Sequence, residues 1–410
     1  MKYCIISSLL LLGVSCINLH GQASGSVYSA YGIGDLRSKA NGQVQGLGGA
    51  GIGLSSQYFL NLTNPASYSS LVPRLNMFFD FGVDANYLSM RSDEATNSHR
   101  SGGLSHLSLW LRFTKGWSST LGLQPYSTVG YSIQSDRYSD VLGEPYNLIY
   151  RGEGGVTRLF WGHSYTLSPF ISIGGNANFL FGSIDRSQTF TSSSIISNFV
   201  LNEEVFLRAF SYDLGLQVHL PVGRDLLTLG TTFSPGIDLK ANTDVSLDGF
   251  SDELVAENIE EEQYGLPMEI GGGLSWKAEG FLLTTDLIYR DWEDIGTSQD
   301  IEFVNTWTTR LGLEFIPFKN ELLDYEHSLL IRTGFEMQNA NWRINGINFS
   351  EWSYTIGLGI PFNRYTHHMN LNYTYHQRGT LSNHLIQEAK HEVSVSFTLR
   401  DIWFMKRKIF

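Results

Sequence analysis

The sequence predicts an all-β protein, a transmembrane antiparallel β-barrel of about 14 strands. The first support is an alternation of apolar and polar residues, as in 392–399, where Val393, Val395 and Phe397 are apolar and their neighbours are polar. Successive side chains of a strand point to opposite faces, so such a stretch has one face for lipid and one for a polar lumen. The second support is that short and long connections alternate between these stretches. The third is the export-type start of the chain.

The chain starts like an exported protein. A short positive start precedes an apolar run at 5–14, which has the length of a signal-peptide core and is too short to span a bilayer. Small residues follow, and we expect cleavage after Gly21, so that 1–21 is a signal peptide. A lipid anchor on Cys16 is the alternative, and Gly13 is a poor residue three positions before such a cysteine. Export and a barrel together predict the outer membrane of a Gram-negative cell.

Composition narrows the function classes. The only cysteines are Cys4 and Cys16, so a chain cleaved after Gly21 has no disulfide, thiolate metal site or cysteine nucleophile. The formal charge of −12 argues against a nucleic-acid partner. Aromatic residues make up 13% of the chain, which is typical of barrels with aromatic girdles. No apolar run after the start reaches the ~18 residues of a membrane helix.

We divide the mature chain into an N-terminal segment at 22–73, rich in Gly, Ser and Asn, and a barrel at 74–410. An even number of strands is expected when both ends of a barrel lie on the same side. The predicted strands are 74–90, 101–114, 117–135, 147–166, 169–188, 204–220, 226–245, 264–277, 280–295, 303–317, 327–342, 349–363, 367–380 and 390–404.

Tight connections alternate with longer ones, as periplasmic turns and external loops do in such barrels. Two connections fit this pattern poorly, because 318–326 is long for a turn and 343–348 is short for a loop. The predicted external loops are 91–100, 136–146, 189–203, 246–263, 296–302 and 381–389.

Two soluble all-β folds are alternatives. A β-sandwich also alternates, but sandwiches of this size usually split into domains of about 100 residues. A propeller would repeat a motif every ~40–50 residues, and no such repeat occurs. The membrane barrel is therefore the predicted fold.

Motifs in the N-terminal segment point to a family. Gly32-Ile-Gly-Asp35 is followed by Gly46-Leu-Gly-Gly-Ala-Gly51 and by Asn64-Pro65-Ala66-Ser67. This order resembles the N-terminal plug, or hatch, of the long-chain fatty acid transporter (FadL/TodX-type) family of outer-membrane barrels. The resemblance covers the whole chain in architecture, with its motifs mainly within 31–70.

The resemblance implies a fourteen-stranded barrel whose lumen is blocked by a hatch. It also implies import of a hydrophobic small molecule, such as a fatty acid or an aromatic hydrocarbon, through a monomer that contacts only ligand and outer-membrane lipid. Ligand would leave sideways through an inward kink in the third strand. The residues that we expect to hold or gate the hatch are Asn64, Pro65, Ala66, Gly48 and Gly49.

The Asn-Pro-Ala motif can be interpreted physically. Pro65 lacks an N–H and favours an extended Asn64, whose side chain bonds nearby backbone in Asx turns. Taken alone, the motif is an ordinary turn; its place after a glycine-rich stretch and before the first strand favours the hatch. The apolar residues Phe59, Leu60 and Leu62 are the candidate ligand contacts, by analogy with apolar pockets in general.

Pro125 is the most informative residue of the barrel. It lies within the predicted third strand, where a proline cannot donate to the ladder and signals a bulge, bend or unpaired edge. Together with Gly130, it is our candidate for the lateral-exit kink. A structural bulge without a transport role is the alternative.

Three other motifs do not predict a binding site. The G-x-G-x-x-G of Gly46, Gly48 and Gly51 lacks the preceding strand and the later acidic residue of a dinucleotide site. The acidic loop 246–263 lacks EF-hand spacing, and His367-His368 point to opposite faces of a strand. We therefore predict no metal and no cofactor.

No hydrolase motif occurs, so we predict no catalytic residues and no enzyme activity. A barrel enzyme with a nucleophile or paired carboxylates at its mouth is the least favoured alternative. The main alternative to transport is a sealed barrel, closed by its hatch, that acts as a protein-binding or scaffold component.

Overall fold

The computed structural model describes residues 25–71, 76–93, 95–139, 143–192, 199–248, 254–257, 264–292, 301–317, 328–344, 346–362, 367–381 and 385–401. The predicted signal peptide at 1–21, with Cys16, lies outside these residues, as does most of the acidic loop.

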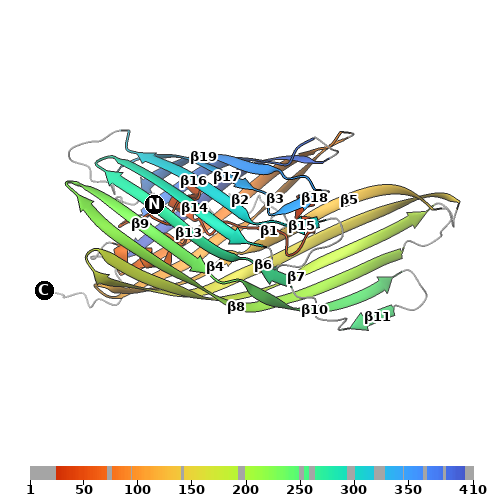
Figure 1. Ribbon diagram of the computed structural model, residues 1–410, viewed down its shortest axis with the longest axis horizontal. Coiled ribbons are helices and arrows are strands. Elements are labelled where there is room, and N and C mark those ends of the chain that lie inside the picture. The colour runs from red at the N-terminus through yellow and green to blue at the C-terminus, as the bar shows by residue number, and fades with distance from the viewer. Residues whose placement is uncertain are drawn as a thin grey trace, which may run out of the picture.

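The described chain forms a closed antiparallel barrel of 14 strands, which confirms the predicted fold (Figure 1). Each strand pairs with its neighbours in sequence, and the last pairs with the first from Met77 opposite Asp401 to Arg91 opposite Gln387. The unbroken wall strands are β2 (Met77–Arg91), β3 (Thr96–Thr114), β6 (Glu144–Ser168), β7 (Ile171–Ser192), β8 (Phe199–Val222), β14 (Phe281–Asp291), β16 (Thr306–Phe315), β17 (Leu330–Asn339), β19 (Ser350–Phe362), β20 (His367–Arg378) and β21 (Gln387–Asp401).

Three wall strands are interrupted. The third consists of β4 (Trp117–Pro125) and β5 (Ser127–Ser139), the seventh of β9 (Asp225–Ser234) and β10 (Ile237–Asp248), and the eighth of β12 (Tyr264–Leu266) and β13 (Met268–Ala278). In all three cases a proline lies at the break: Pro125, Pro235 and Pro267. Three short strands stand beyond the wall at the long-loop end: β11 (Leu254–Glu257), which pairs with β10, and β15 (Ile301–Phe303), which pairs with β18 (Trp342–Ile344).

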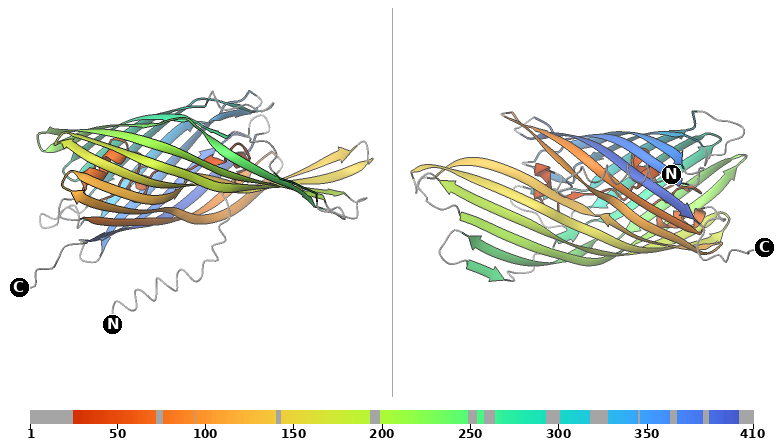
Figure 2. Two further views of the ribbon diagram at one scale, coloured as in Figure 1. Left: turned by 90° about the horizontal axis from the view of Figure 1, so that it is seen from below. Right: turned by 180° about the vertical axis from the view of Figure 1, so that it is seen from behind.

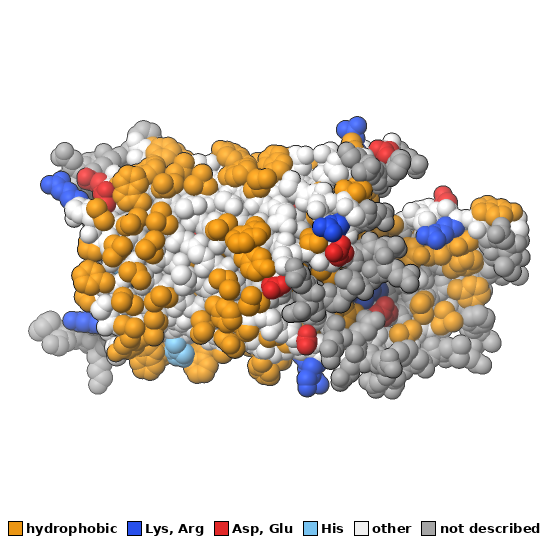
Figure 3. All heavy atoms as spheres, viewed as in Figure 1, with side chains coloured by type: hydrophobic (Ala, Val, Ile, Leu, Met, Phe, Trp, Pro, Cys, Tyr) orange, Lys and Arg blue, Asp and Glu red, His pale blue; other side chains and the backbone are white. Residues whose placement is uncertain are grey.

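The alternation in the sequence becomes an inside and an outside. In β16, Trp307 and Leu311 are exposed on the outer surface, whereas Thr308 and Arg310 are buried in the lumen. Hydrophobic side chains gather in a broad band over the outer surface, and charged side chains lie mainly beyond it (Figure 3). None of the described helices is long and apolar enough to cross a membrane.

One side of the barrel is taller than the other. At the long-loop end, β5, β6, β7, β8 and β10 reach past the rest of the wall (Figures 1 and 2). On the outer face of this projection, Glu153 lies opposite Asp185, Asp185 opposite Glu204, and Glu204 opposite Asp244. Carboxylates in such a row cannot face hydrocarbon, so this level of the wall lies outside the membrane.

The N-terminal segment, here residues 25–71, lies within the barrel (Figure 2). Its elements are η1 (Val27–Ala30), β1 (Asp35–Leu36), α2 (Gly42–Gly46) and η2 (Pro65–Ser70). The helix α2 contacts β17, β19, β20 and β21, while η2 contacts β4, β6, β7 and β8. The segment therefore spans the lumen from one wall to the other.

Candidate functional site

The Asn-Pro-Ala corner is fixed between two walls. Asn64 accepts a hydrogen bond from Ala66 N–H at 3.0 Å and caps η2, in which Pro65 takes the first position. Its amide donates to Ile52 O at 2.8 Å and to Leu216 O of β8 at 3.3 Å. Asn64 is buried, and its side chain joins the Asn-Pro-Ala turn both to Ile52 of the segment and to β8 of the wall. The predicted Asx turn has formed, and its role in gating stays a prediction.

Glycines of the wall form the bed for this segment, and we did not predict them. A Cβ at Gly215 would lie 2.1 Å from Asn64 Oδ1, and one at Gly334 would lie 2.1 Å from Gly48 N. Gly48 and Gly49 both have positive φ, +65° and +81°, which suits glycine. Strand glycines that signal close backbone approach were visible in the sequence. The wall glycines in such contact with the segment include Gly174, Gly215, Gly230, Gly273, Gly312 and Gly334.

We call residues 39–71 the lower part of the segment and residues 25–38 the upper part. Buried charges bind the lower part to the wall. The Asp286 carboxylate of β14 accepts from the N–H groups of Gly51 at 2.7 Å and Ile52 at 3.0 Å. On the opposite wall, Asp80 of β2 accepts from the amide of Asn41 at 2.6 Å. Such charge-assisted bonds are the stronger kind, so this part of the segment is tightly anchored.

Lys39 marks the upper limit of the anchored part. Its ammonium lies 3.0 Å from Asp213 and 3.4 Å from Glu269. Burial lowers the pKa of Lys39, but the two carboxylates outweigh it and raise that pKa above its ordinary value. Lys39 is therefore charged, and it links the segment to β8 and β13. The Asp213 carboxylate also forms an ion pair with Arg158 at 3.2 Å.

A seam in the wall lies above this level. From Thr96 to His106, β3 pairs with β2 on one edge and has no strand on its other edge within the described residues, because its pairing with β4 starts at Leu107. The facing strand, β5, pairs with β6 on its far edge. We call this break between Thr96–His106 and Ser127–Ser139 the seam.

The N-terminal segment occupies the edge that β3 leaves free. Asp35 and Leu36 of β1 pair with Thr128 and Ser127 of β5. One turn earlier, the Ser29 hydroxyl accepts from Gly130 N–H at 2.9 Å. Backbone groups of β5 that would otherwise lack partners are thus satisfied by the segment.

Charged side chains hold β1 from across the lumen. Arg378 of β20 makes a bidentate ion pair with Asp35, at 2.8 and 3.0 Å, and also contacts Glu388 at 2.9 Å. Arg37 bonds Asp84 of β2 at 3.1 Å. Both guanidinium groups are partly exposed to the lumen.

A cavity of about 680 Å³ opens beside β1. It reaches the seam at Ser105 and Thr128, and Pro125 borders it just below. Its lining is mixed, because aromatic rings such as Trp292 and Trp352 alternate with ion pairs such as Arg310 with Glu336 at 2.5 Å. The charged lining residues are Asp35, Arg37, Arg186, Arg290, Arg310, Glu336, Glu351, Arg378, Glu388, Lys390 and Glu392.

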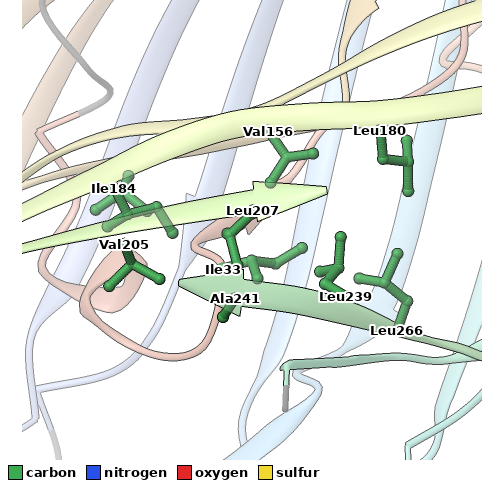
Figure 4. Close-up of a cluster of buried hydrophobic side chains, with 10 residues drawn as sticks. Ile33, Val156, Leu180, Ile184, Val205, Leu207, Leu239, Ala241 and Leu266 are labelled. Atoms are coloured by element: carbon green, nitrogen blue, oxygen red, sulfur yellow. The ribbon is translucent and has the colours of Figure 1, made fainter. Parts of the chain in front are cut away.

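The tall wall contributes an apolar side. Ile33 of the segment packs into a cluster with Ile184, Val205 and Leu207 of β7 and β8, together with Leu239 of β10 (Figure 4). Ile33 also lines the cavity. Ile184, Val205, Leu207 and Leu239 do not line it, so this side of the cavity is apolar at Ile33.

The candidate ligand contacts lie elsewhere. Leu60 and Leu62 are buried in a second cluster that includes Trp110 and Phe160 of the wall. Phe59 packs against His368, with ring centroids 4.8 Å apart. None of the three lines the cavity, and their contact with ligand stays a prediction.

Within the described ranges, no group of three His, Cys, Asp or Glu side chains could hold a metal ion. Of the charges that face the lumen, Glu314 pairs with Arg332 at 2.6 Å and Arg290 pairs with Glu269 at 2.7 Å. These lumen charges are therefore engaged in holding the interior together.

Comparison with known proteins places the chain in a family. The sequence matches the BamG family over residues 1–410. The chain belongs to the BamG family. A search of curated proteins gives no match to this BamG-family chain.

Solved structures share the fold of this BamG-family chain. A FadL homologue of Pseudomonas aeruginosa matches with a TM-score of 0.64 at 12% identity, over 90% of this chain and 99% of that one. The toluene transporter TodX of Pseudomonas putida gives 0.62 at 14%, over 89% and 100%. CymD, a monoaromatic hydrocarbon channel, gives 0.58 at 15%, over 90% and 100%. The predicted likeness to FadL-type barrels is thus confirmed for the fold.

Proposed function

We propose that this chain is an outer-membrane channel for hydrophobic small molecules, with the N-terminal segment as its hatch and the seam as its lateral exit. One observation carries the proposal. Strand β1 takes the place of β3 along β5, at the point where the cavity reaches Pro125 and Thr128. Here a piece of the N-terminal segment, in place of a wall strand, would separate the cavity from the lipid beside the barrel.

The neighbours add support through their fold and their described roles. TodX is described as a toluene transporter and CymD as a monoaromatic hydrocarbon channel. For this chain we infer entry from the long-loop end, which is the external side in barrels of this kind. The apolar cluster around Ile33 would receive the ligand.

Exit would require β1 to separate from β5. The lower part of the segment is anchored by Asn64, Pro65 and Ala66 and by the bed under Gly48 and Gly49. Strand β1, by contrast, is held by two residue pairs with β5 and by ion pairs that border the cavity. Pro125 would mark the exit at the membrane, because its nitrogen has no N–H to bond to β3. Gly130 lies opposite Glu153 of the acidic row and would mark the upper edge of the exit.

A reversible disulfide lock between β1 and β5 tests the lateral exit. Leu36 and Ser127 are directly opposite in antiparallel register, and directly opposite residues have Cβ atoms ~4.5–5.5 Å apart, close enough for a disulfide with small adjustment. We expect Leu36→Cys/Ser127→Cys to lose uptake of labelled oleate and toluene by cells when oxidised, and to regain it after reduction.

The control is Thr355→Cys/Thr374→Cys, a directly opposite pair of the fixed wall strands β19 and β20. Oxidation of this pair should leave uptake unchanged. Full uptake through the oxidised Leu36–Ser127 lock would overturn the lateral exit. Uptake equal to that of cells without the chain, in the unmodified protein, would overturn transport itself.

A second candidate function is that of a sealed barrel that binds another protein. The projection of β5 to β8 and β10 on one side favours it, because this wall extends beyond the membrane level marked by the acidic row. It predicts a stoichiometric partner on pull-down, recovered equally with the oxidised lock, and no small molecule in the cavity.

A further inference from the structure

We propose that the outer face of β8 and β10 carries a binding site for the phosphate of a membrane lipid, centred on Arg208 and Lys240. The two side chains lie directly opposite each other on neighbouring strands, and both are exposed. The site is separate from the cavity and does not depend on transport.

The pair faces the membrane rather than the lumen. The residues on either side of Arg208 in sequence, Leu207 and Ala209, belong to or pack on the apolar cluster inside the tall wall. Because successive side chains alternate, Arg208 points outward. Leu239 and Ala241 place Lys240 on the same outer face by the same rule.

Exposed aromatic rings surround Arg208. Phe206 and Phe210 flank it on the same face of β8 and are 45% and 80% exposed. Phe181, 38% exposed, lies opposite it on β7. Exposed aromatic residues of this kind mark the interface between hydrocarbon and headgroups, so the two cations lie within the interfacial band.

The acidic row sets the upper limit of the membrane interface on this face. Glu204 is four residues from Arg208 on β8, or ~13 Å along the strand, and it faces Asp185 and Asp244. The row lies on the water side. Arg208 and Lys240 are therefore located between aromatic rings and carboxylates, at the depth of lipid headgroups.

Two like charges directly opposite on a sheet destabilise it. Asp238, two residues before Lys240, is the acidic residue beside the pair, yet among the described residues no ion pair joins it to Arg208 or Lys240. An anion between the two cations would relieve their repulsion. At this depth the abundant anion is a lipid phosphate, and basic sites at this level bind such headgroups. The acyl chains would run along Phe210 and Tyr212.

Native mass spectrometry of the detergent-purified chain tests the site. We expect lipid A or phosphatidylglycerol to bind the unmodified chain, and Arg208→Gln/Lys240→Gln to bind it on the order of tenfold more weakly. Dephosphorylated lipid A and diacylglycerol, which both lack a phosphate, should bind both proteins equally. The two phosphate lipids compared side by side identify which headgroup the site prefers.

The matched control is Lys115→Gln, which removes an exposed cation from a turn at the opposite end of the barrel and should leave binding unchanged. Both variants should keep the heat-resistant mobility of a folded barrel, since all three side chains are exposed. Equal phosphate-lipid affinity in the unmodified chain and the double variant would overturn the proposal. So would binding that is independent of the phosphate, or capture of an acidic protein in place of lipid.

Discussion

The two parts of the N-terminal segment differ in how they meet the wall. Residues 39–71 pack into glycine beds and buried clusters, and their polar groups bond buried carboxylates such as Asp286. Residues 25–38 also bury Tyr28 and Ile33 in apolar clusters, but around β1 they border the 680 Å³ cavity and the seam, where charges such as Asp35 remain partly exposed. The lower part is built as a fixed plug.

This difference indicates which part of the segment can move at a low cost in free energy. Separating the lower part would leave buried carboxylates and apolar clusters without partners, which costs several kcal/mol. Separating β1 breaks two residue pairs with β5 and partly exposed ion pairs. Strand β1 is therefore the piece that we expect to move when ligand passes.

The largest expected effect is the loss of apolar packing in the lower part. Leu62→Ala should lower the free energy of unfolding by about 2–5 kcal/mol, because Leu62 is 1% exposed among Trp110 and Phe160. Leu36→Ala, in the half-buried upper part, should lower it by about 1 kcal/mol. Urea titration in detergent measures both, and equal losses would contradict the comparison.

The next effect is steric and has a matched control on one strand. A Cβ at Gly273 would lie 2.6 Å from Gly53 N, whereas a Cβ at Gly272 meets nothing within 4 Å. Gly273→Ala should destabilise the barrel by about 1–3 kcal/mol, and Gly272→Ala should be neutral. Thermal loss of heat-resistant mobility on gels is the measurement. Equal transitions would show that the lower part is loosely seated.

Lys39 tests the boundary between the two parts. Lys39→Met leaves Arg158 as the cation beside Asp213 and Arg290 as the cation beside Glu269, and it should cost about 1–3 kcal/mol.

Because folding raises the pKa of Lys39, its contribution is fully present below the ordinary lysine pKa of about 10.4. It is lost only as pH rises through the folded value. The difference from the unmodified protein should then be the same at about pH 6 and about pH 9, both below that pKa. A difference that shrinks at the higher pH would show that Lys39 is already losing its proton.

The strands were predictable because alternation is a local signal. The break at Pro125 followed from the missing N–H of proline, and Pro235 carried the same signal within 226–245, where we predicted an unbroken strand. The local Asx turn at Asn64 was predictable for the same reason.

Contacts across the lumen were not predictable. Asp35 and Arg378 are 343 residues apart, and nothing local to either residue indicates the other. The wall glycines look like ordinary strand glycines until the path of the N-terminal segment is known. Phe59 and Leu62 were chosen as ligand contacts for their apolarity, which serves packing equally well.

The smallest expected change in stability belongs to the upper part, and it carries the sharpest functional test. Asp35→Asn keeps the shape of the side chain, and Arg378 keeps Glu388 at 2.9 Å, so the change should cost about 1 kcal/mol. The same change should weaken the hold on β1. Because Ser127 is 2% exposed beneath it, maleimide labelling of Ser127→Cys should then become several-fold faster. Thr374→Cys, in the fixed wall, should label at one rate in both backgrounds. If Ser127→Cys also keeps its rate, Arg378 does not control the seam, and the backbone pairing of β1 alone holds it closed.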